Sequence, residues 1–160
     1  MIEETADPPA ERPLQPIPRS LPAILMRARE AVMTRVRPVL RAYDMTEPQW
    51  RVLRTLASID EIEVTHLAEL VFLLPSSLSR ILKDLTERGL IQRRTTESDL
   101  RKGLVSISDA GTALIEAAQP EAAKVTTEIE RLFGTDRLGR LIGLLEELEE
   151  AVGPAQPTAD

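Results

Sequence analysis

Along most of the chain, apolar residues recur at intervals of three and four, which is the pattern of amphipathic helices. The segment 21–41 shows it first, and Ser20 is predicted to cap this helix, with Pro22 in its first turn. Pro38 is expected to kink or shorten its end. The predicted inward stripe consists of Leu21, Leu25, Ala28, Val32, Val36 and Val39.

Three shorter helical patterns follow the first. Thr46 is predicted to cap the second helix, and residues 58–63 are predicted to form a loop. A third helix is expected over 65–73 and a fourth over 76–88, where Gly89 supplies the stop. The third is expected to bury Leu67, Ala68, Leu70 and Val71, and the fourth Leu78, Ile81, Leu82 and Leu85.

After Gly89 the helical spacing of apolar residues is lost, and it returns after Ser108. Two short apolar segments, one starting at residues 90–91 and one at 103–107, flank the polar stretch 95–102, which predicts a β-hairpin. Ser108 is expected to cap a long helix that Pro120 kinks and Gly134 ends. A last helix over 138–152 carries a coiled-coil-like seam of Leu138, Leu141, Leu145, Leu148 and Val152.

Composition favours a single helical domain. The chain has 160 residues, 42% of them hydrophobic, but aromatic residues make up only 2%. Aliphatic side chains must therefore fill the core, which suits helix packing better than a β-sandwich. The expected fold class is mainly α with a small β-hairpin wing, in the order of a winged helix-turn-helix.

Several function classes lose support from composition. Cysteine is absent, which excludes disulfides, thiol redox sensing and thiolate metal sites. No apolar run approaches the roughly 20 residues that span a bilayer. Residues 1–18 are acidic and proline-rich, unlike a secretory signal, and are predicted to form a flexible arm. A cytoplasmic protein without membrane association is expected.

The charge is distributed unevenly. The net charge is −6, yet residues 88–102 carry five basic and two acidic residues. Residues 109–160 carry four basic and eleven acidic residues. Because screening at physiological salt acts over about 8 Å, a basic patch on an acidic protein can still contact phosphate. This asymmetry is typical of a nucleic-acid-binding lobe joined to an acidic oligomerisation module.

The fourth helix and the hairpin supply the candidate DNA contacts. The short 74–75 turn presents the fourth helix across the third, and a helix of this kind fits the major groove of DNA. Its outward residues are predicted to be Ser76, Ser77, Ser79, Arg80 and Lys83, where Arg80 suits a guanine edge. An ordinary solvated helix face is the alternative.

The predicted wing adds further cations. Arg93, Arg94, Arg101 and Lys102 are candidate DNA contacts, and Arg101 is the expected minor-groove probe. Asp99 is expected to support the Arg101 guanidinium rather than to contact DNA. The alternative is a hairpin turn with solvated charges.

Taken together, these segments resemble the MarR family over about residues 20–150. The resemblance covers the third helix, the recognition helix and the wing in order, and is carried by LAEL at 67–70, SRILKDL at 79–85, RGLIQR at 88–93 and DLRK at 99–102. It implies a dimer, with the following division of the chain: arm 1–18, N-terminal dimerisation helix 19–45, DNA-binding lobe 46–107, C-terminal dimerisation helices 108–152 and tail 153–160.

Within that family the chain is similar to the homoprotocatechuate-degradation repressor branch, through RSLP at 19–22, LMRARE at 25–30 and FLLPSSLSR at 72–80. The resemblance implies a homodimeric repressor of aromatic-acid catabolic genes. It also implies release from a pseudo-palindromic, double-stranded operator when a small aromatic acid binds between the dimer module and the DNA-binding lobe.

Candidate effector residues follow from the chemistry of a carboxylate, which needs arginine or clustered N–H donors. Arg19 and Ser20 precede the first helix, and Arg27 lies at the edge of its apolar stripe. Trp50 could line the pocket or be plain core. His66 is the sole histidine, and we expect it to be exposed rather than to contact a ligand. Surface arginines making intersubunit ion pairs are the alternative.

The sequence offers little support for other classes of function. One histidine, no cysteine and no glycine-rich phosphate loop leave nothing from which to assemble a catalytic site, so no enzyme, no cofactor and no metal are expected. A winged-helix module that binds proteins rather than DNA stays open as an alternative. So does a MarR-type regulator that answers to a different ligand, such as an aromatic acyl-CoA.

Overall fold

The computed structural model describes residues 20–96 and 99–153, and for residues 95–96 and 99–102 it describes the backbone alone. Six helices and three strands follow one another in this part of the chain: α1 (Leu21–Ala42), α2 (Glu47–Leu56), β1 (Ile62–Glu63), α3 (Val64–Leu70), α4 (Pro75–Glu87), β2 (Ile91–Thr96), β3 (Asp99–Ile107), α5 (Asp109–Phe133) and α6 (Thr135–Val152). The predicted arm 1–18 and tail residues 154–160 lie outside the described residues.

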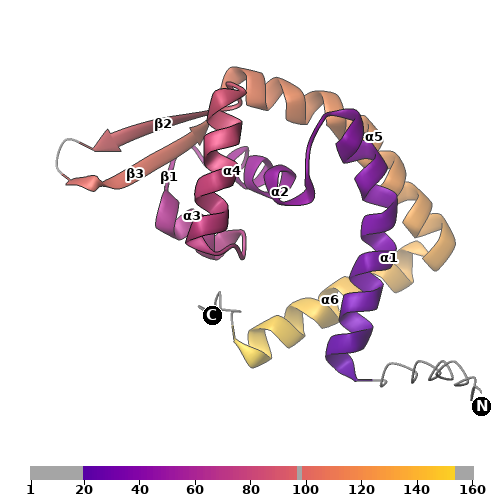
Figure 1. Cartoon of the computed structure of the whole chain (residues 1–160). Coiled ribbons are helices and arrows are strands. Elements are labelled where there is room, and N and C mark those ends of the chain that lie inside the picture. The colour runs from indigo at the N-terminus through magenta and orange to yellow at the C-terminus, as the bar shows by residue number, and fades with distance from the viewer. Residues whose placement is uncertain (1–19, 97–98, 154–160) are drawn as a thin grey trace, which may run out of the picture.

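The elements form two parts. Helices α2, α3 and α4 pack together with a β-ribbon that projects from one side, and this is the predicted winged helix-turn-helix lobe (Figure 1). Helices α1, α5 and α6 form the other part, and α5 bends along its course as it leaves the lobe (Figure 1). The fold class expected from the sequence is confirmed.

The sheet is antiparallel, with strand order β1-β3-β2. Strands β2 and β3 form the predicted hairpin, in which Ile91 pairs with Ile107 and Arg93 with Val105. Strand β1 pairs Ile62 with Val105 and was predicted as loop. That prediction was wrong because a two-residue strand has no periodicity of its own and exists only through its pairing with β3.

One aliphatic core holds the lobe together. The largest fully buried side chains come from α2, from α3 and its C-cap residue, from α4 and from β3, and they are Val52, Leu53, Leu56, Leu67, Val71, Leu78, Leu82, Leu85 and Val105. The inward face predicted for the fourth helix is thus largely correct, with Ile81 half-buried. Leu70 was predicted to be buried, but its side chain is 51% exposed because α3 ends there and its inward positions are used by Leu67, Ala68 and Val71.

Most predicted helix boundaries carry the expected caps. Thr46 accepts a hydrogen bond from the Gln49 N–H, and the Gln49 side chain accepts one from the Thr46 N–H, which makes a capping box. The Ser108 hydroxyl accepts from the Gly111 N–H at 3.1 Å. Gly89 lies at φ 69°, where glycine is favoured, directly after the C-cap of α4.

Two predictions about α1 need correction. Ser20 occupies the N-cap position, but its side chain makes no capping hydrogen bond. Pro38 does not end the helix, which continues to Ala42 with the proline exposed. The predicted apolar stripe of α1 is also largely exposed, since Leu40 is the only residue of α1 that is fully buried.

Helices α1, α5 and α6 share an unusual apolar surface. Helix α6 contains no buried residue. Large apolar side chains are exposed on these three helices, among them Leu21, Ile24, Leu25, Val32, Leu132, Leu141, Ile142 and Leu145. Of the helices that the structure describes, none is both long enough and apolar enough to cross a bilayer.

Candidate nucleic-acid interface and ligand cavity

Helix α4 presents the polar face that the sequence predicts. Its inner residues Leu78, Leu82 and Leu85 are buried against the lobe. All five predicted DNA contacts on it are exposed: Ser76, Ser77, Ser79, Arg80 and Lys83. Leu74 is the N-cap and provides no side-chain cap, so the first N–H groups of the helix are available to an anion.

A hydrogen bond from α2 to α4 holds the recognition helix in place. Gln49, which belongs to the capping box of α2, donates from its Nε2 to the Asp84 carboxylate at 2.7 Å. Arg88 lies 3.7 Å from the same carboxylate. The start of α2 is therefore joined directly to the last turn of α4.

The two consecutive arginines of β2 point to opposite faces of the strand. Arg93 lies near Gly103 on the neighbouring strand, whereas Arg94 pairs with Glu61, which precedes β1. The Arg94 Nε donates to one Glu61 oxygen at 2.6 Å and its second nitrogen to the other at 2.5 Å. This pairing lowers the pKa of Glu61 and raises that of Arg94. One flat DNA surface cannot meet both arginines through the same face of the ribbon.

At the residues predicted to form the wing tip, the structure describes only the backbone. Asp99, Arg101 and Lys102 belong to β3, which places them in the hairpin as expected. The orientation of their side chains lies outside what the structure describes. Their roles remain predictions.

A cavity of about 600 Å³ opens between α1 and α2, and we call it the α1–α2 cavity. Trp50, Met33 and Val36 form its apolar wall, and the cations Arg29, Arg51 and Arg54 line it with a single carboxylate, Glu47. Its size is within the range of about 300–1,000 Å³ found for small-ligand sites. An apolar wall beside an excess of guanidinium groups suits an anion with a flat hydrophobic body.

A second cavity of about 220 Å³ lies on the other side of the same tryptophan, and we call it the α2–α5 cavity. It is lined by α2 and α5, through residues that include Ile115, Gln119 and Ala122. Trp50 and Arg54 line both cavities. These two side chains therefore lie at the junction between the lobe and the long helices.

The predicted effector residues do not all gather at these cavities. Trp50 lines both, but Arg27 is exposed on α1 and is not among the lining residues of either. Ser20 is exposed at the start of α1, and Arg19 lies outside the described residues. His66 is exposed, as expected, 4.0 Å from Glu69.

Sequence reasoning missed three cavity arginines. Arg54 lies four residues after Trp50, so the two share one face of α2. Arg29 lies four residues before Met33 on α1, and this spacing also places them on one face. Same-face spacing was thus an available signal for each helix, but only the tertiary structure brings the two faces together.

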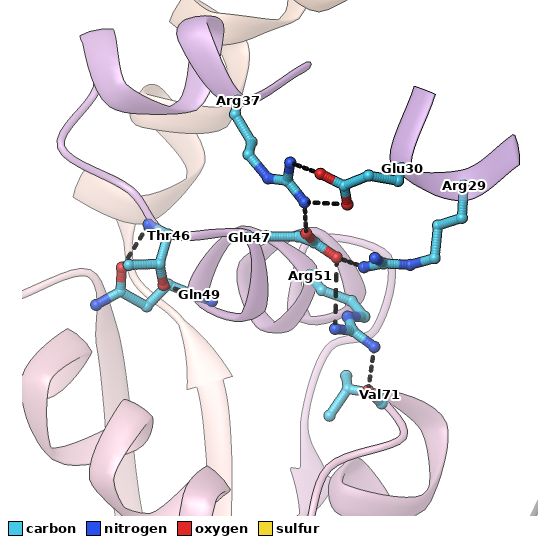
Figure 2. Close-up of polar contacts among 8 residues, drawn as sticks. All are labelled: Arg29, Glu30, Arg37, Thr46, Glu47, Gln49, Arg51 and Val71. Atoms are coloured by element: carbon cyan, nitrogen blue, oxygen red, sulfur yellow. Dashed lines mark hydrogen bonds and ion pairs between the residues drawn. The ribbon is translucent and has the colours of Figure 1, made fainter. Parts of the chain in front are cut away.

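The cavity wall contains a polar network around Glu47, and Figure 2 shows it. The Glu47 carboxylate pairs with Arg29 of α1, and it lies 3.8 Å from Arg37 and 3.9 Å from Arg51. Arg51 also donates to the Val71 carbonyl at 2.9 Å. We call Arg29, Glu30, Arg37, Glu47 and Arg51 the Glu47 cluster.

Charges within this cluster are unevenly compensated. Arg37 forms a two-pronged pair with Glu30, which raises the pKa of Arg37 and lowers that of Glu30. For Arg51 the direction is reversed: burial, followed by repulsion from Arg29, lowers its pKa. Arg51, which lines the cavity, is therefore the arginine of the cluster whose charged form burial disfavours.

Comparisons with known proteins decide the family. The model of the MarR family matches residues 45–102. The homoprotocatechuate degradative operon repressor of Escherichia coli is 35% identical over 128 residues, which cover 80% of this chain and 86% of the repressor. The chain belongs to the MarR family.

Solved structures of MarR-family regulators share the fold. The crystal structure of a transcriptional regulator, 32% identical, superposes with a TM-score of 0.79 and covers 83% of this chain and 98% of its own. The crystal structure of NadR in complex with 4-hydroxyphenylacetate is 33% identical, with a TM-score of 0.71, covering 86% of this chain and 97% of NadR. The protein is thus a MarR-family transcriptional regulator with a winged-helix DNA-binding lobe.

Proposed function

We propose that this MarR-family chain is a homodimeric repressor of aromatic-acid catabolic genes that leaves its operator when a small aromatic carboxylate binds at Trp50. The observation that carries the proposal is the position of Trp50 and Arg54, which line both cavities between the lobe and the long helices. An aromatic ring can stack on Trp50 while its carboxylate is held by the cavity arginines, Arg54 among them.

Two relatives support this ligand class. The 35% identical Escherichia coli protein is a homoprotocatechuate degradative operon repressor, and NadR was crystallised with 4-hydroxyphenylacetate. Both names refer to phenylacetates, which combine a flat ring with one carboxylate. The lining of the α1–α2 cavity fits the same two features.

The exposed apolar surface supports the homodimer. Monomeric proteins rarely expose contiguous apolar patches of more than a few hundred Å². Here α1, α5 and α6 expose more than eight large apolar side chains, and α6 buries none of its residues within the chain. A symmetric pair would present two α4 helices to successive major grooves, roughly 34 Å apart, and hence read a pseudo-palindrome.

DNA binding is tested with an operator selected from random duplexes, by fluorescence anisotropy across a range of salt concentrations. Arg80→Ala is expected to weaken binding by about 1–3 kcal/mol, the value of one good base contact. Arg101→Ala, which removes the cation expected in the minor groove, is expected to weaken binding and to make it less dependent on salt. Lys124→Ala, on α5 and paired with Glu121, is the matched control and is expected to bind as wild type. Unchanged binding by both lobe variants would favour the protein-interaction alternative.

The effector class is tested by thermal shift and by release of operator, with 4-hydroxyphenylacetate as the probe. A ligand that binds only the folded state raises its apparent stability. We expect the acid to stabilise the wild type and to weaken operator binding, and Arg54→Gln to lose both responses. An acid that leaves melting temperature and operator affinity unchanged refutes the effector class while leaving DNA binding intact.

A further inference from the structure

The Glu47 carboxylate already pairs with two of the three arginines that line the α1–α2 cavity. It is 20% exposed and contacts Arg29 from α1 and Arg51 from its own helix. Glu47, Arg29 and Arg51 all line the α1–α2 cavity. A carboxylate entering this cavity therefore competes with a carboxylate that is already bound there.

We propose that Glu47 is an internal counter-anion, which an anionic effector displaces from Arg29 and Arg51, and that this exchange loosens the tie between α1 and α2. This inference rests on the proposed function, because it concerns regulation of the same cavity. The exchange needs no new cation, since the ligand takes over guanidinium groups that the protein has already placed.

The balance of charge favours such an exchange. Three arginines and one glutamate line the cavity, so a second anion enters an environment that is still net positive. Burial, followed by repulsion from the nearby Arg29, lowers the pKa of Arg51, so a second anion placed beside it would stabilise its charged form. Glu30 does not compete for the ligand's position, because its two oxygens are engaged by Arg37.

The same contacts lead from the cavity to the recognition helix. Arg51 donates to the carbonyl of Val71, the residue that caps the end of α3. Phe72 follows with φ 50°, an uncommon conformation for an aromatic residue, and α4 begins at Pro75. A shift of Arg51 from Glu47 toward a ligand therefore acts on the turn that sets the angle of α4.

The first experiment compares Glu47→Gln with wild type, using 4-hydroxyphenylacetate and its uncharged analogue 4-hydroxyphenylacetamide. Without a competing charge, the variant should bind the acid about three- to tenfold more tightly, as expected when one like charge leaves an anion site. The amide should show no such gain. Operator affinity without ligand should fall, and the further loss on adding the acid should be smaller than in wild type, because linkage is reciprocal.

Two further variants separate exchange from a general loss of stability. Arg29→Gln should weaken binding of the acid, the opposite sign from Glu47→Gln, whereas damage to the fold would change both variants in one direction. Glu128→Gln is the matched control, since Glu128 pairs with Arg35 of α1 at 3.7 Å and lines neither cavity. It should behave as wild type.

The outcomes distinguish this proposal from the one on which it rests. If wild type binds operator but ignores the acid, both the effector class and the exchange are refuted. If wild type responds while Glu47→Gln binds the acid no more tightly, or gains equally for the amide, only the exchange is refuted. Circular dichroism of each variant confirms that its fold is retained.

Discussion

Gly111 lies at the tightest contact between α5 and the lobe. It is buried in the first turn of α5. A Cβ atom built on it would lie 2.2 Å from the Leu90 carbonyl oxygen, 2.7 Å from Ile107 Cγ1 and 3.2 Å from Leu53 Cδ2. The first of these is a backbone atom that cannot rotate away. The Leu90 carbonyl also accepts the Ser108 N–H at 3.1 Å, so moving it strains a backbone hydrogen bond at the start of α5.

The size of the effect of Gly111→Ala follows from two opposing terms. Alanine in a helix is favoured over glycine by about 1 kcal/mol. Overpacking a rigid core site costs about 1–3 kcal/mol or more, and each strained hydrogen bond adds about 1 kcal/mol. The hydrogen-bond term offsets the helix preference, so we expect a net loss of about 1–3 kcal/mol in the free energy of unfolding.

Urea unfolding followed by far-UV circular dichroism measures this loss, at one fixed protein concentration because dimerisation couples to stability. With a slope of about 2 kcal/mol/M, the midpoint should fall by about 0.5–1.5 M. Gly103→Ala is the control, because its added Cβ would meet Val64 at an ordinary 3.6 Å. That variant should stay within about 0.5 kcal/mol of wild type. If Gly111→Ala is as stable as wild type, the close packing of α5 on the wing base is wrong.

Three other substitutions test contacts that join elements. Thr46→Ala removes the hydroxyl of the capping box and should lower the free energy of unfolding by about 1 kcal/mol in urea titrations. Tyr43→Phe removes the hydrogen bond from the phenol to the Ala117 carbonyl at 2.7 Å and should cost about 1 kcal/mol in the same assay. Glu61→Gln removes a carboxyl whose pKa Arg94 lowers in the folded state. The stability that it contributes is present above the usual pKa of 4.5 and is lost as pH falls through the lowered value, so the melting temperatures of wild type and variant should converge in acid.

For each of these three substitutions, a specific result would contradict the prediction. Thr46→Ser should restore the cap, and equal losses for serine and alanine would contradict the capping explanation. For Tyr43→Phe, an unchanged stability would mean that water replaces the phenol at the carbonyl. A constant difference in melting temperature at every pH would show that Glu61 acts through shape rather than charge.

The sequence by itself determined most of the local structure. The capping residues Thr46 and Ser108, together with Gly89 after α4, mark boundaries through short-range hydrogen bonds and backbone preferences. The outward face of α4 could also be predicted from the helical spacing of its apolar residues, because the positions of the buried leucines decide which residues remain exposed. The candidate DNA contacts on that helix needed no further information.

The tertiary structure decided which distant residues meet. Strand β1 exists only because β3 supplies its hydrogen-bond partners, and Arg94 was separated from Arg93 by pairing with Glu61. Neither the β1–β3 pairing nor the Arg94–Glu61 ion pair is indicated by residues close by in the chain. Likewise Trp50 was a candidate from its chemistry alone, but the arginines beside it come from two helices whose relative placement no spacing in the chain encodes.

Local structure could thus be predicted from the sequence, because capping and amphipathic periodicity depend on residues that are only a few positions apart in the chain. The Glu47 cluster and the cavities depend on the packing of α1 against α2, which burial of aliphatic side chains sets across the whole lobe. Charge pairing then follows from that packing. For this reason the sequence offered candidate effector residues one by one, whereas only the folded chain showed that Glu47 pairs with arginines of the cavity.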